Sequence, residues 1–339
     1  MCHGLRIAVV GLGVAGSYLL RRLSLEHEVV GFDRQRRENF KAICAWGTSR
    51  NQIKKILQKV EIDFDEYLLH LGDNLVLDNG KESSSIPLLG LCTFDKRRLE
   101  LDMTKGYKVF YGTTPTLEDL RRDFDLIIDA TGVSRTLLPP APRDKIVPCF
   151  QYRVKYHGKM PFEDFYVRIF SSWDGYLWYF PLGDSEAYVG AGHMGGNHVA
   201  EVNTFINRYG GSPVEKMGKS VRIAPPELMT PFFDGKVVGV GESIGTVFPL
   251  LGEGILPSLE CAEILAETLE NREAYRRKVL ETFKPFSDMY RLIQLRQNNQ
   301  LSLTRHFPLV LRCYRYMKER EERFGLVIRR SDLMLIINA

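Results

Sequence analysis

The sequence of 339 residues lacks any Cys-x-x-Cys pair and any cysteine–histidine spacing of the kind that binds zinc or an iron–sulfur cluster. Its cysteines lie far apart, at Cys2, Cys44, Cys92, Cys149, Cys261 and Cys313. Scattered thiols of this kind are typical of proteins in a reducing compartment. We therefore expect no metal site.

The sequence also lacks a long hydrophobic run and a strong charge of either sign. No stretch of about 18 apolar residues is present, the length that crosses a bilayer as a helix. No signal-like segment precedes the first predicted strand, and the net charge of +4 is too small to indicate nucleic-acid binding. Basic clusters at 34–37 and 318–330 are typical of solvated surfaces, although such a surface can also face anionic lipid. We expect a cytoplasmic protein, with association at a membrane surface left open.

What the sequence does contain is a strand, a glycine turn and a helix near its start. The apolar run RIAVV predicts a buried parallel strand, and Gly11, Gly13 and Gly16 follow it in Gly-x-Gly-x-x-Gly spacing, with Ala15 in the same turn. In a dinucleotide-binding fold the first glycine allows the tight turn and the second lets the backbone approach a pyrophosphate. The third lets the helix pack on the strand. The pattern predicts a bound dinucleotide.

The next predicted strand, EVVGFD, ends in Asp33. A carboxylate at this position accepts hydrogen bonds from the adenosine ribose hydroxyls. Arg34 follows it and could meet a 2′-phosphate, but Asp33 would repel one. The motif alone does not choose between NAD and FAD.

Residues 123–135 contain a further apolar strand, LIID, which ends in an Ala-Thr-Gly turn at Gly132. Residues 235–269 contain the strand KVVGVGES, which ends in Gly241 and Glu242. A glycine-rich turn and an amphipathic helix follow it. The residues of interest in that turn are Gly252, Gly254 and Ile255.

This downstream segment resembles the flavoproteins of the p-hydroxybenzoate hydroxylase superfamily, in which a Gly-Asp pair precedes a Pro-x-x-Gly-x-Gly-Ile turn. The resemblance implies that Glu242, in place of the usual Asp, accepts a hydrogen bond from a ribityl hydroxyl. It also implies that the turn faces the pyrimidine end of the isoalloxazine ring. In these proteins Gly132 would follow the strand that crosses the adenosine half of the cofactor. The two motifs, far apart in sequence, predict FAD rather than NAD.

The segment between these motifs has a different character. Several stretches within residues 149–220 alternate polar and apolar residues and are rich in Tyr, Phe and Val, with turns between them. Such alternation predicts a small antiparallel sheet. Inserted in an FAD domain, a sheet of this kind normally forms a wall over the flavin.

One stretch of this sheet, YLWYFPLGDSEAYVGAG, fits the pattern Tyr-x-Trp-x-Phe-Pro, eight residues, Gly-x-Gly. This pattern resembles that of the geranylgeranyl reductases, flavoenzymes that saturate the prenyl chains of archaeal membrane lipids and chlorophyll precursors. The resemblance covers nearly the whole chain. It implies a substrate wall made of Tyr176, Trp178, Phe180, Pro181, Gly190 and Gly192.

The same resemblance implies further flavin contacts. A loop after Asp33 keeps Cys44 and Gly47 of the family's Cys-Gly-Glu-like loop, with Ala45 and Trp46 where Gly and Glu are commoner. Lys96 stands where the family has Arg in an Arg-x-x-Phe-Asp segment. The resemblance implies a cofactor contact at Lys96, with Arg97 or Arg98 as the alternatives.

The chemistry of prenyl reduction sets what these residues must do. Reduced flavin supplies a hydride to one carbon, and a proton must reach the other. Tyr176, Trp178 and Phe180 share one face of a strand because side chains repeat every two residues. Cys44 is either the proton donor or a small neighbour of the flavin. His193 is either an acid or an ordinary surface histidine.

These observations predict an α/β fold: an FAD-binding, Rossmann-like domain of the p-hydroxybenzoate hydroxylase type with an inserted antiparallel-sheet substrate domain and a short helical C-terminus. The predicted boundaries are 1–148 and 221–275 for the FAD domain, 149–220 for the sheet and 276–339 for the helical segment.

The predicted function is an FAD-dependent reductase of prenyl chains in a lipid or isoprenoid. No second nucleotide motif is present, which leaves ferredoxin or NAD(P)H as electron donor. The alternatives are a flavin monooxygenase of the same superfamily and a flavin- or lipid-binding protein without reductase activity. A relative of the electron-transfer flavoprotein:quinone oxidoreductases would need a four-cysteine cluster, which this sequence lacks.

Overall fold

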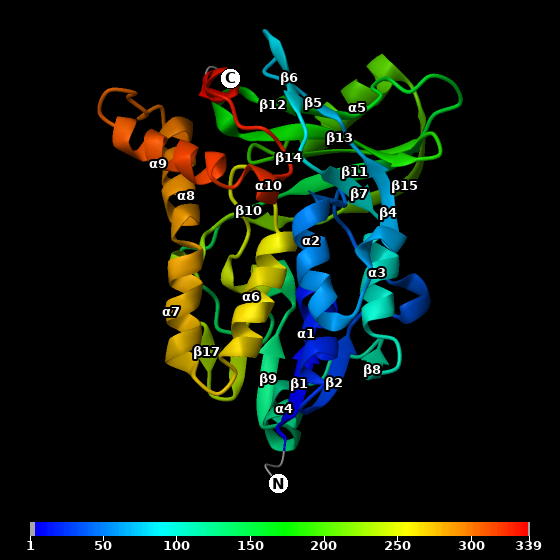
Figure 1. The fold of residues 1–339 in the computed structure, drawn as a ribbon, viewed down its shortest axis with the longest axis vertical. Helices are drawn as coiled ribbons and strands as arrows, with labels where there is room; N and C mark the ends of the chain where they lie inside the picture. The colour runs from blue at the N-terminus through cyan, green and yellow to red at the C-terminus, as the bar shows by residue number, and fades with distance from the viewer. Residues whose placement is uncertain (1–3, 338–339) are drawn as a thin grey trace.

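The computed structural model describes residues 4–337. It contains two large sheets, one above the other in the view of Figure 1. The lower sheet has six strands in the order β17-β18-β9-β1-β2-β8. Its strands are β1 (Arg6–Val10), β2 (Glu28–Asp33), β8 (Lys108–Tyr111), β9 (Leu126–Asp129), β17 (Phe233–Asp234) and β18 (Val237–Gly239). All neighbours pair in parallel except β17, which runs antiparallel to β18. This is the doubly wound sheet that the glycine motif predicts.

The start of this sheet shows why its glycines are required. Gly11 has a φ of +90°, which L side chains rarely adopt. A Cβ atom at Gly16 would lie 1.8 Å from the Gly11 carbonyl oxygen. The close approach of helix α1 (Val14–Leu23) to the end of β1 therefore depends on both glycines.

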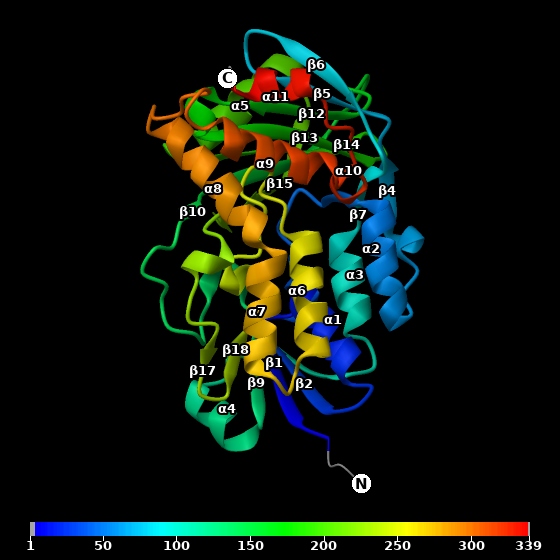
Figure 2. The same cartoon turned by 60° about the vertical axis from the view of Figure 1, so that its left-hand side comes forward.

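Helices form a layer against this sheet. Helix α1 lies between α6 (Ile255–Glu267) and α3 (Lys96–Met103), and Figure 2 shows the three running side by side. The other helices of this part are α2 (Arg50–Leu57) and α4 (Leu117–Asp123). Buried side chains such as Leu19, Ile127 and Leu259 make this interface the centre of the main core.

The upper sheet has seven strands in the order β15-β11-β14-β13-β12-β5-β6. They are β5 (Asn74–Asp78), β6 (Ser83–Pro87), β11 (Cys149–Lys155), β12 (Phe165–Ile169), β13 (Gly175–Gly183), β14 (Glu186–His193) and β15 (Ser212–Gly218). Helix α5 (His198–Tyr209) packs on one face. The predicted sheet is present, but β5 and β6 join it from the first segment of the chain. Because β5 pairs in parallel with β12, the sheet is mixed rather than purely antiparallel.

Two smaller units complete the strand arrangement. A three-stranded antiparallel sheet is formed by β3 (Gly47–Ser49), β4 (Leu68–Leu71) and β7 (Leu91–Phe94). A short pair is formed by β10 (Ile146–Val147) and β16 (Val221–Arg222). The domain boundaries given above stay a prediction.

The C-terminal part is helical, as predicted. It consists of α7 (Arg272–Thr282), α8 (Lys284–Gln297), α9 (Phe307–Lys318), α10 (Glu321–Phe324) and α11 (Arg330–Ile337). In Figure 1, α7 and α8 run up one side of the molecule from the lower sheet to the upper one. Helix α11 returns to the upper sheet, where Leu335 packs with Leu75, Leu77 and Ile86.

Within residues 4–337, no helix is both long enough and apolar enough to cross a membrane. The same residues hold no cluster of His, Cys, Asp or Glu side chains that could bind a metal ion. Cys44, Cys92, Cys149, Cys261 and Cys313 are free thiols, and Cys2 lies outside the described residues.

Candidate functional site

A cavity of about 690 Å³ lies where the carboxyl ends of β1, β2 and β9 face the upper sheet. In open α/β sheets this edge is where ligands bind. Most of the residues that the sequence singled out line the cavity. They are Gly11, Gly13, Ala15, Asp33, Arg34, Cys44, Ala45, Gly47, Lys96, Gly132, Tyr176, Trp178, Phe180, Gly192, Glu242, Gly252, Gly254 and Ile255.

Four of the singled-out residues lie behind the cavity wall and support it. Gly16 lies beneath the Gly11 carbonyl, and Gly190 lies beneath the Trp178 ring. Gly241 has a φ of +67° and packs near Ser258. The carbonyl oxygen of Pro181 accepts a hydrogen bond from the Thr93 hydroxyl.

The glycine turn and Asp33 form one unit at the lower end of the cavity. The Asp33 carboxylate accepts hydrogen bonds of 2.8 Å from the backbone amides of Leu12 and Gln35. It thereby ties the end of β2 to the turn that follows β1. The first turn of α1 carries no acidic residue and no side-chain cap, and Gly13, Val14 and Ala15 line the cavity. The free N–H groups and positive dipole end of this helix suit a pyrophosphate.

A buried ion pair lies beside this turn. The ammonium of Lys96 donates a hydrogen bond to Glu100 Oε1, and the two residues are 8% and 1% exposed. Burial raises the pKa of Glu100, and the attraction of Lys96 offsets only part of that rise. Burial alone would lower the pKa of Lys96, but the attraction and hydrogen bond of Glu100, together with other nearby groups, outweigh burial and raise the pKa. A Cβ atom at Gly13 would lie 4.0 Å from Glu100 Oε1, so the pair adjoins the pyrophosphate position.

The second oxygen of this carboxylate is unusual. Glu100 Oε2 is buried and has no hydrogen-bond partner, which is costly for a carboxylate. Sequence reasoning missed Glu100. The signal that could have found it is its position four residues after Lys96 on a helix, where opposite charges meet.

A second residue that sequence reasoning missed, Arg222, joins the two turns that follow β9 and β18. Its buried guanidinium donates to the carbonyl oxygens of Glu242 at 2.7 Å and Val133 at 2.8 Å, and pairs with Asp144 at 2.8 Å. Its backbone amide donates to Glu242 Oε1 at 2.9 Å. Glu242 Oε2 faces Gly132, where a Cβ atom would lie 3.1 Å away. Gly132 and Glu242 are therefore held on the same wall.

The aromatic strand β13 presents two different faces. Tyr176, Trp178 and Phe180 line the cavity, whereas Leu177 and Tyr179 are buried in the core beneath α5. The rings of Tyr176 and Trp178 meet edge to face at a centroid distance of 5.8 Å. Trp178 Nε1 is buried without a partner in the cavity wall.

The other two aromatic side chains are fixed by their neighbours. The Tyr176 hydroxyl donates to the Leu251 carbonyl oxygen beside Gly252, and burial raises the pKa of Tyr176. Phe180 packs against Gly47, where a Cβ atom would lie 2.5 Å from its ring. The aromatic face thus contacts both loops that the resemblance assigned to the flavin.

The Cys44 loop lines the cavity. Cys44 Sγ accepts a contact of 3.3 Å from the Trp46 amide, and its carbonyl accepts a 3.0 Å hydrogen bond from Gln151. Cys149 lies on the same wall, and burial raises its pKa to about 12, so it stays a thiol at neutral pH. His193 is not among the lining residues and packs on Phe170 at a ring distance of 5.1 Å.

The upper end of the cavity is apolar. Strands β5 and β12 contribute Leu75, Leu77, Val167 and Ile169 to it. The C-terminal half of the chain contributes Ile293, Phe324, Leu326 and Ile336. Sequence reasoning missed this arm because its residues come from separate elements that only the fold brings together. One cavity therefore combines a polar, glycine-lined end with an apolar arm.

The polar end fits a dinucleotide. The glycine turn has room for a pyrophosphate, and the unpartnered oxygen of Glu100 can accept a hydrogen bond from a sugar hydroxyl. Asp33, Gly132 and Glu242 lie on the same walls.

No protein-family model matches the chain. Digeranylgeranylglycerophospholipid reductase 2 of Methanothermobacter thermautotrophicus is 32% identical over 155 residues, which are 42% of this chain and 40% of that protein. The match thus spans about two fifths of the relative's length. It confirms the resemblance to geranylgeranyl reductases that the sequence motifs indicate.

Solved structures with the same fold cover more of the chain. A geranylgeranyl bacteriochlorophyll reductase-like protein from Thermoplasma acidophilum has a TM-score of 0.71 at 15% identity, over 99% of this chain and 96% of that one. PqsL from Pseudomonas aeruginosa, a probable FAD-dependent monooxygenase, has a TM-score of 0.62 at 16% identity, over 88% and 98%. The flavin-dependent halogenase CmlS has a TM-score of 0.63 at 17% identity, over 100% and 70%. The chain has the fold of flavin-dependent oxidoreductases and resembles, in sequence, the geranylgeranyl reductases among them.

Proposed function

We propose that this chain is an FAD-dependent reductase that saturates carbon–carbon double bonds in the prenyl chains of a lipid or isoprenoid. The observation that carries the proposal is the continuity of one cavity, which runs from the glycine turn past the face of β13 into an apolar arm. A polar substrate would leave that arm without a function. The resemblance to a digeranylgeranylglycerophospholipid reductase supports the same substrate class.

The polar end would hold FAD through contacts of known type. The amides at the start of α1 would bind the pyrophosphate, and Asp33 would accept hydrogen bonds from the adenosine ribose. Glu242 would accept one from the ribityl chain. Reduced FAD supplies the hydride when bound, and ferredoxin or NAD(P)H would supply its electrons.

The aromatic face would orient the substrate. An isolated alkene has no polar handle, so it must be held flat and close to the flavin, at about 3–3.5 Å, by shape alone. Tyr176, Trp178 and Phe180 provide an apolar surface for this and exclude water.

The proton for the second carbon would come from Cys44 in this proposal. Its sulfur accepts from the Trp46 amide, which leaves the S–H hydrogen free to point into the cavity. The Tyr176 hydroxyl already donates to Leu251. Hydride at one carbon and proton at the other balance the reduction of the double bond, and solvent would return the proton to the thiol.

The experiment that tests the function starts from the purified protein loaded with FAD. The bound flavin is reduced with dithionite under argon, and a geranylgeranyl lipid is added while the flavin absorbance is followed. Reoxidation of the flavin by the lipid, without oxygen, supports the proposal. Reoxidation only by oxygen, with hydroxylation of an added aromatic compound, would instead favour a monooxygenase, which the fold of PqsL makes the second candidate.

A further inference from the structure

The apolar arm of the cavity is closed by a segment from the far end of the sequence. Phe324, Leu326 and Ile336 line the arm, although its other walls come from strands near residues 75 and 167. We call residues 323–336 the end segment. It begins next to the turn at Gly252–Gly254, because the buried Arg323 pairs with Glu253 at 2.8 Å. The end segment therefore extends from the proposed flavin turn to the upper sheet.

Backbone hydrogen bonds hold the middle of the end segment. The amide of Leu89 donates to the Gly325 carbonyl at 2.7 Å, and the amide of Val327 donates to the Pro87 carbonyl at 3.0 Å. Leu326 and Leu88 form an antiparallel bridge between these two bonds. Leu326 is thus fixed on the wall by its backbone as well as by packing.

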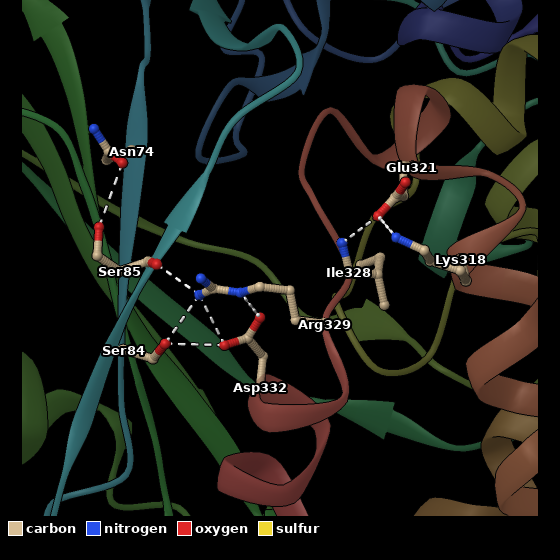
Figure 3. Close-up of polar contacts among 8 residues, drawn as sticks. All are labelled: Asn74, Ser84, Ser85, Lys318, Glu321, Ile328, Arg329 and Asp332. Carbon is tan, nitrogen blue, oxygen red and sulfur yellow. Dashed lines mark hydrogen bonds and ion pairs between the residues drawn. The ribbon is translucent and has the colours of Figure 1, made fainter.

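A polar clasp then joins the end segment to β6 (Figure 3). Arg329 donates to the Ser85 carbonyl at 2.6 Å and to the Ser84 hydroxyl at 3.1 Å. It also pairs with Asp332 at 2.8 Å, and Asp332 accepts a 2.9 Å hydrogen bond from Ser84. Asp332 is only 4% exposed, so the carboxylate end of this network is buried, whereas the Arg329 side chain is 39% exposed.

The neighbouring loop is secured in the same way. Glu321 accepts hydrogen bonds of 2.6 Å from the Ile328 amide and from Lys318, as Figure 3 also shows. Farther along, the indole N–H of Trp173 donates to the Ile336 carbonyl at 2.6 Å, and Asn79 donates to the Leu335 carbonyl at 3.1 Å. Trp173 itself lines the cavity. The position of Ile336 in the arm is therefore set from several directions.

From these contacts we propose that the end segment is the end wall of the substrate arm, and that Leu326 and Ile336 set the length of prenyl chain the cavity accepts. This inference rests on the proposed function, since it assumes that the arm holds a prenyl chain. This wall is held by backbone hydrogen bonds and by the buried pair of Arg323 and Glu253, so it should move little when a prenyl chain is too long for the cavity. Each methylene that fits or fails to fit an apolar pocket changes binding by about 10–200-fold.

The test compares wild type with three variants. Leu326→Ala and Ile336→Ala make the wall side chains smaller and so lengthen the cavity. Ile336→Phe makes the side chain larger and so shortens the cavity. Oxidised, FAD-loaded protein is titrated with farnesyl, geranylgeranyl and geranylfarnesyl alcohols, and the perturbation of the flavin absorbance gives the affinity for each. Leu309→Ala is the control, because Leu309 is buried in the main core and does not line the cavity. Leu326→Val and Ile336→Val serve if an alanine variant fails to fold.

We expect the two alanine variants to raise the affinity for the longest alcohol relative to the shortest by about tenfold or more. Ile336→Phe should shift the preference toward the shorter chain, and Leu309→Ala should leave the wild-type preference unchanged. An unchanged preference in all folded wall variants would overturn the end-wall proposal. If no alcohol perturbs the wild-type flavin at any length, the proposed function itself fails, which is a distinguishable result.

Discussion

The indole of Trp178 lies directly on Gly190 of the neighbouring strand, so closely that a Cβ atom at Gly190 would be 2.4 Å from Trp178 Cζ2. The two residues pair in register across β13 and β14. Only glycine leaves space for the ring in this position. The Gly-x-Gly part of the sequence motif thus has a physical cause, because Gly190 seats the ring that Trp178 presents to the cavity.

The first prediction follows from that contact. In Gly190→Ala the added methyl group should push the indole toward the cavity, because Gln151 Cβ, 2.6 Å from the same point, blocks the other direction. We expect reduction of a prenyl lipid to fall by about tenfold or more, since misplacement of a substrate by about 1 Å can cost 10²-fold. FAD affinity should change little. Flavin fluorescence and lipid turnover measured on the same preparation check this.

Trp178→Ala makes a second prediction about the aromatic face. Loss of the indole removes part of the surface that would orient the substrate, so lipid turnover should slow while FAD stays bound. Tyr179→Phe is the control, because Tyr179 lies on the opposite face of the strand. Release of FAD from Trp178→Ala would mean that the aromatic face is only core.

The buried pair of Lys96 and Glu100 gives a prediction on stability. Lys96→Met leaves the Glu100 carboxylate buried without a cation, which should lower the free energy of unfolding by about 3–5 kcal/mol. Lys96→Met/Glu100→Leu removes both charges and should recover most of that loss. Urea unfolding of the flavin-free proteins measures both.

The pH dependence of Lys96→Met follows from the same pair. Burial already raises the pKa of Glu100, and loss of Lys96 should raise it further. The folded variant then holds a proton that the unfolded chain releases above about pH 4.3, the ordinary pKa of glutamate. Its stability should therefore fall as the pH rises from that value, and the double variant should show no such decline. Equal pH profiles for the two variants would contradict a buried, paired Glu100.

For Asp164 we predict the opposite pH dependence of the free energy of unfolding. Burial alone would raise its pKa, but hydrogen bonds from His70 and from the amides of Asn74 and Asp73 outweigh burial and lower it. Its contribution to stability is thus present above about pH 3.9, the ordinary pKa of aspartate, and is lost as the pH falls through the lowered value. Asp164→Asn should cost about 1.5–3 kcal/mol at neutral pH. The difference from wild type should shrink in acid, as unfolding curves at several pH values would show.

The sequence predicts the six-stranded sheet and its glycine turn well because their signals are local. Gly11, Gly13 and Gly16 lie within one turn, and Asp33 ends the next strand. The alternation of side chains along β13 likewise predicts, without any knowledge of the fold, that Trp178 and Tyr179 lie on opposite faces of the strand.

The features that the sequence did not reveal depend on pairing over long distances. The serine-rich strand β6 has no hydrophobic pattern, and it joins the upper sheet only because β5 pairs with β12. Arg222 and the wall residue Ile336 take their roles from partners far away in the sequence, such as Val133 and Trp173. No local pattern encodes such contacts.

The measurement that tests the account most directly is a single turnover under argon. FAD-loaded protein is reduced with dithionite, and one equivalent of it is mixed with a geranylgeranyl lipid. The masses of the lipid products are then measured by mass spectrometry. We predict one reduced double bond, a gain of two mass units, for each flavin that is oxidised. Oxidation of the flavin without a change in lipid mass, or no oxidation at all, would contradict the assignment of a prenyl reductase.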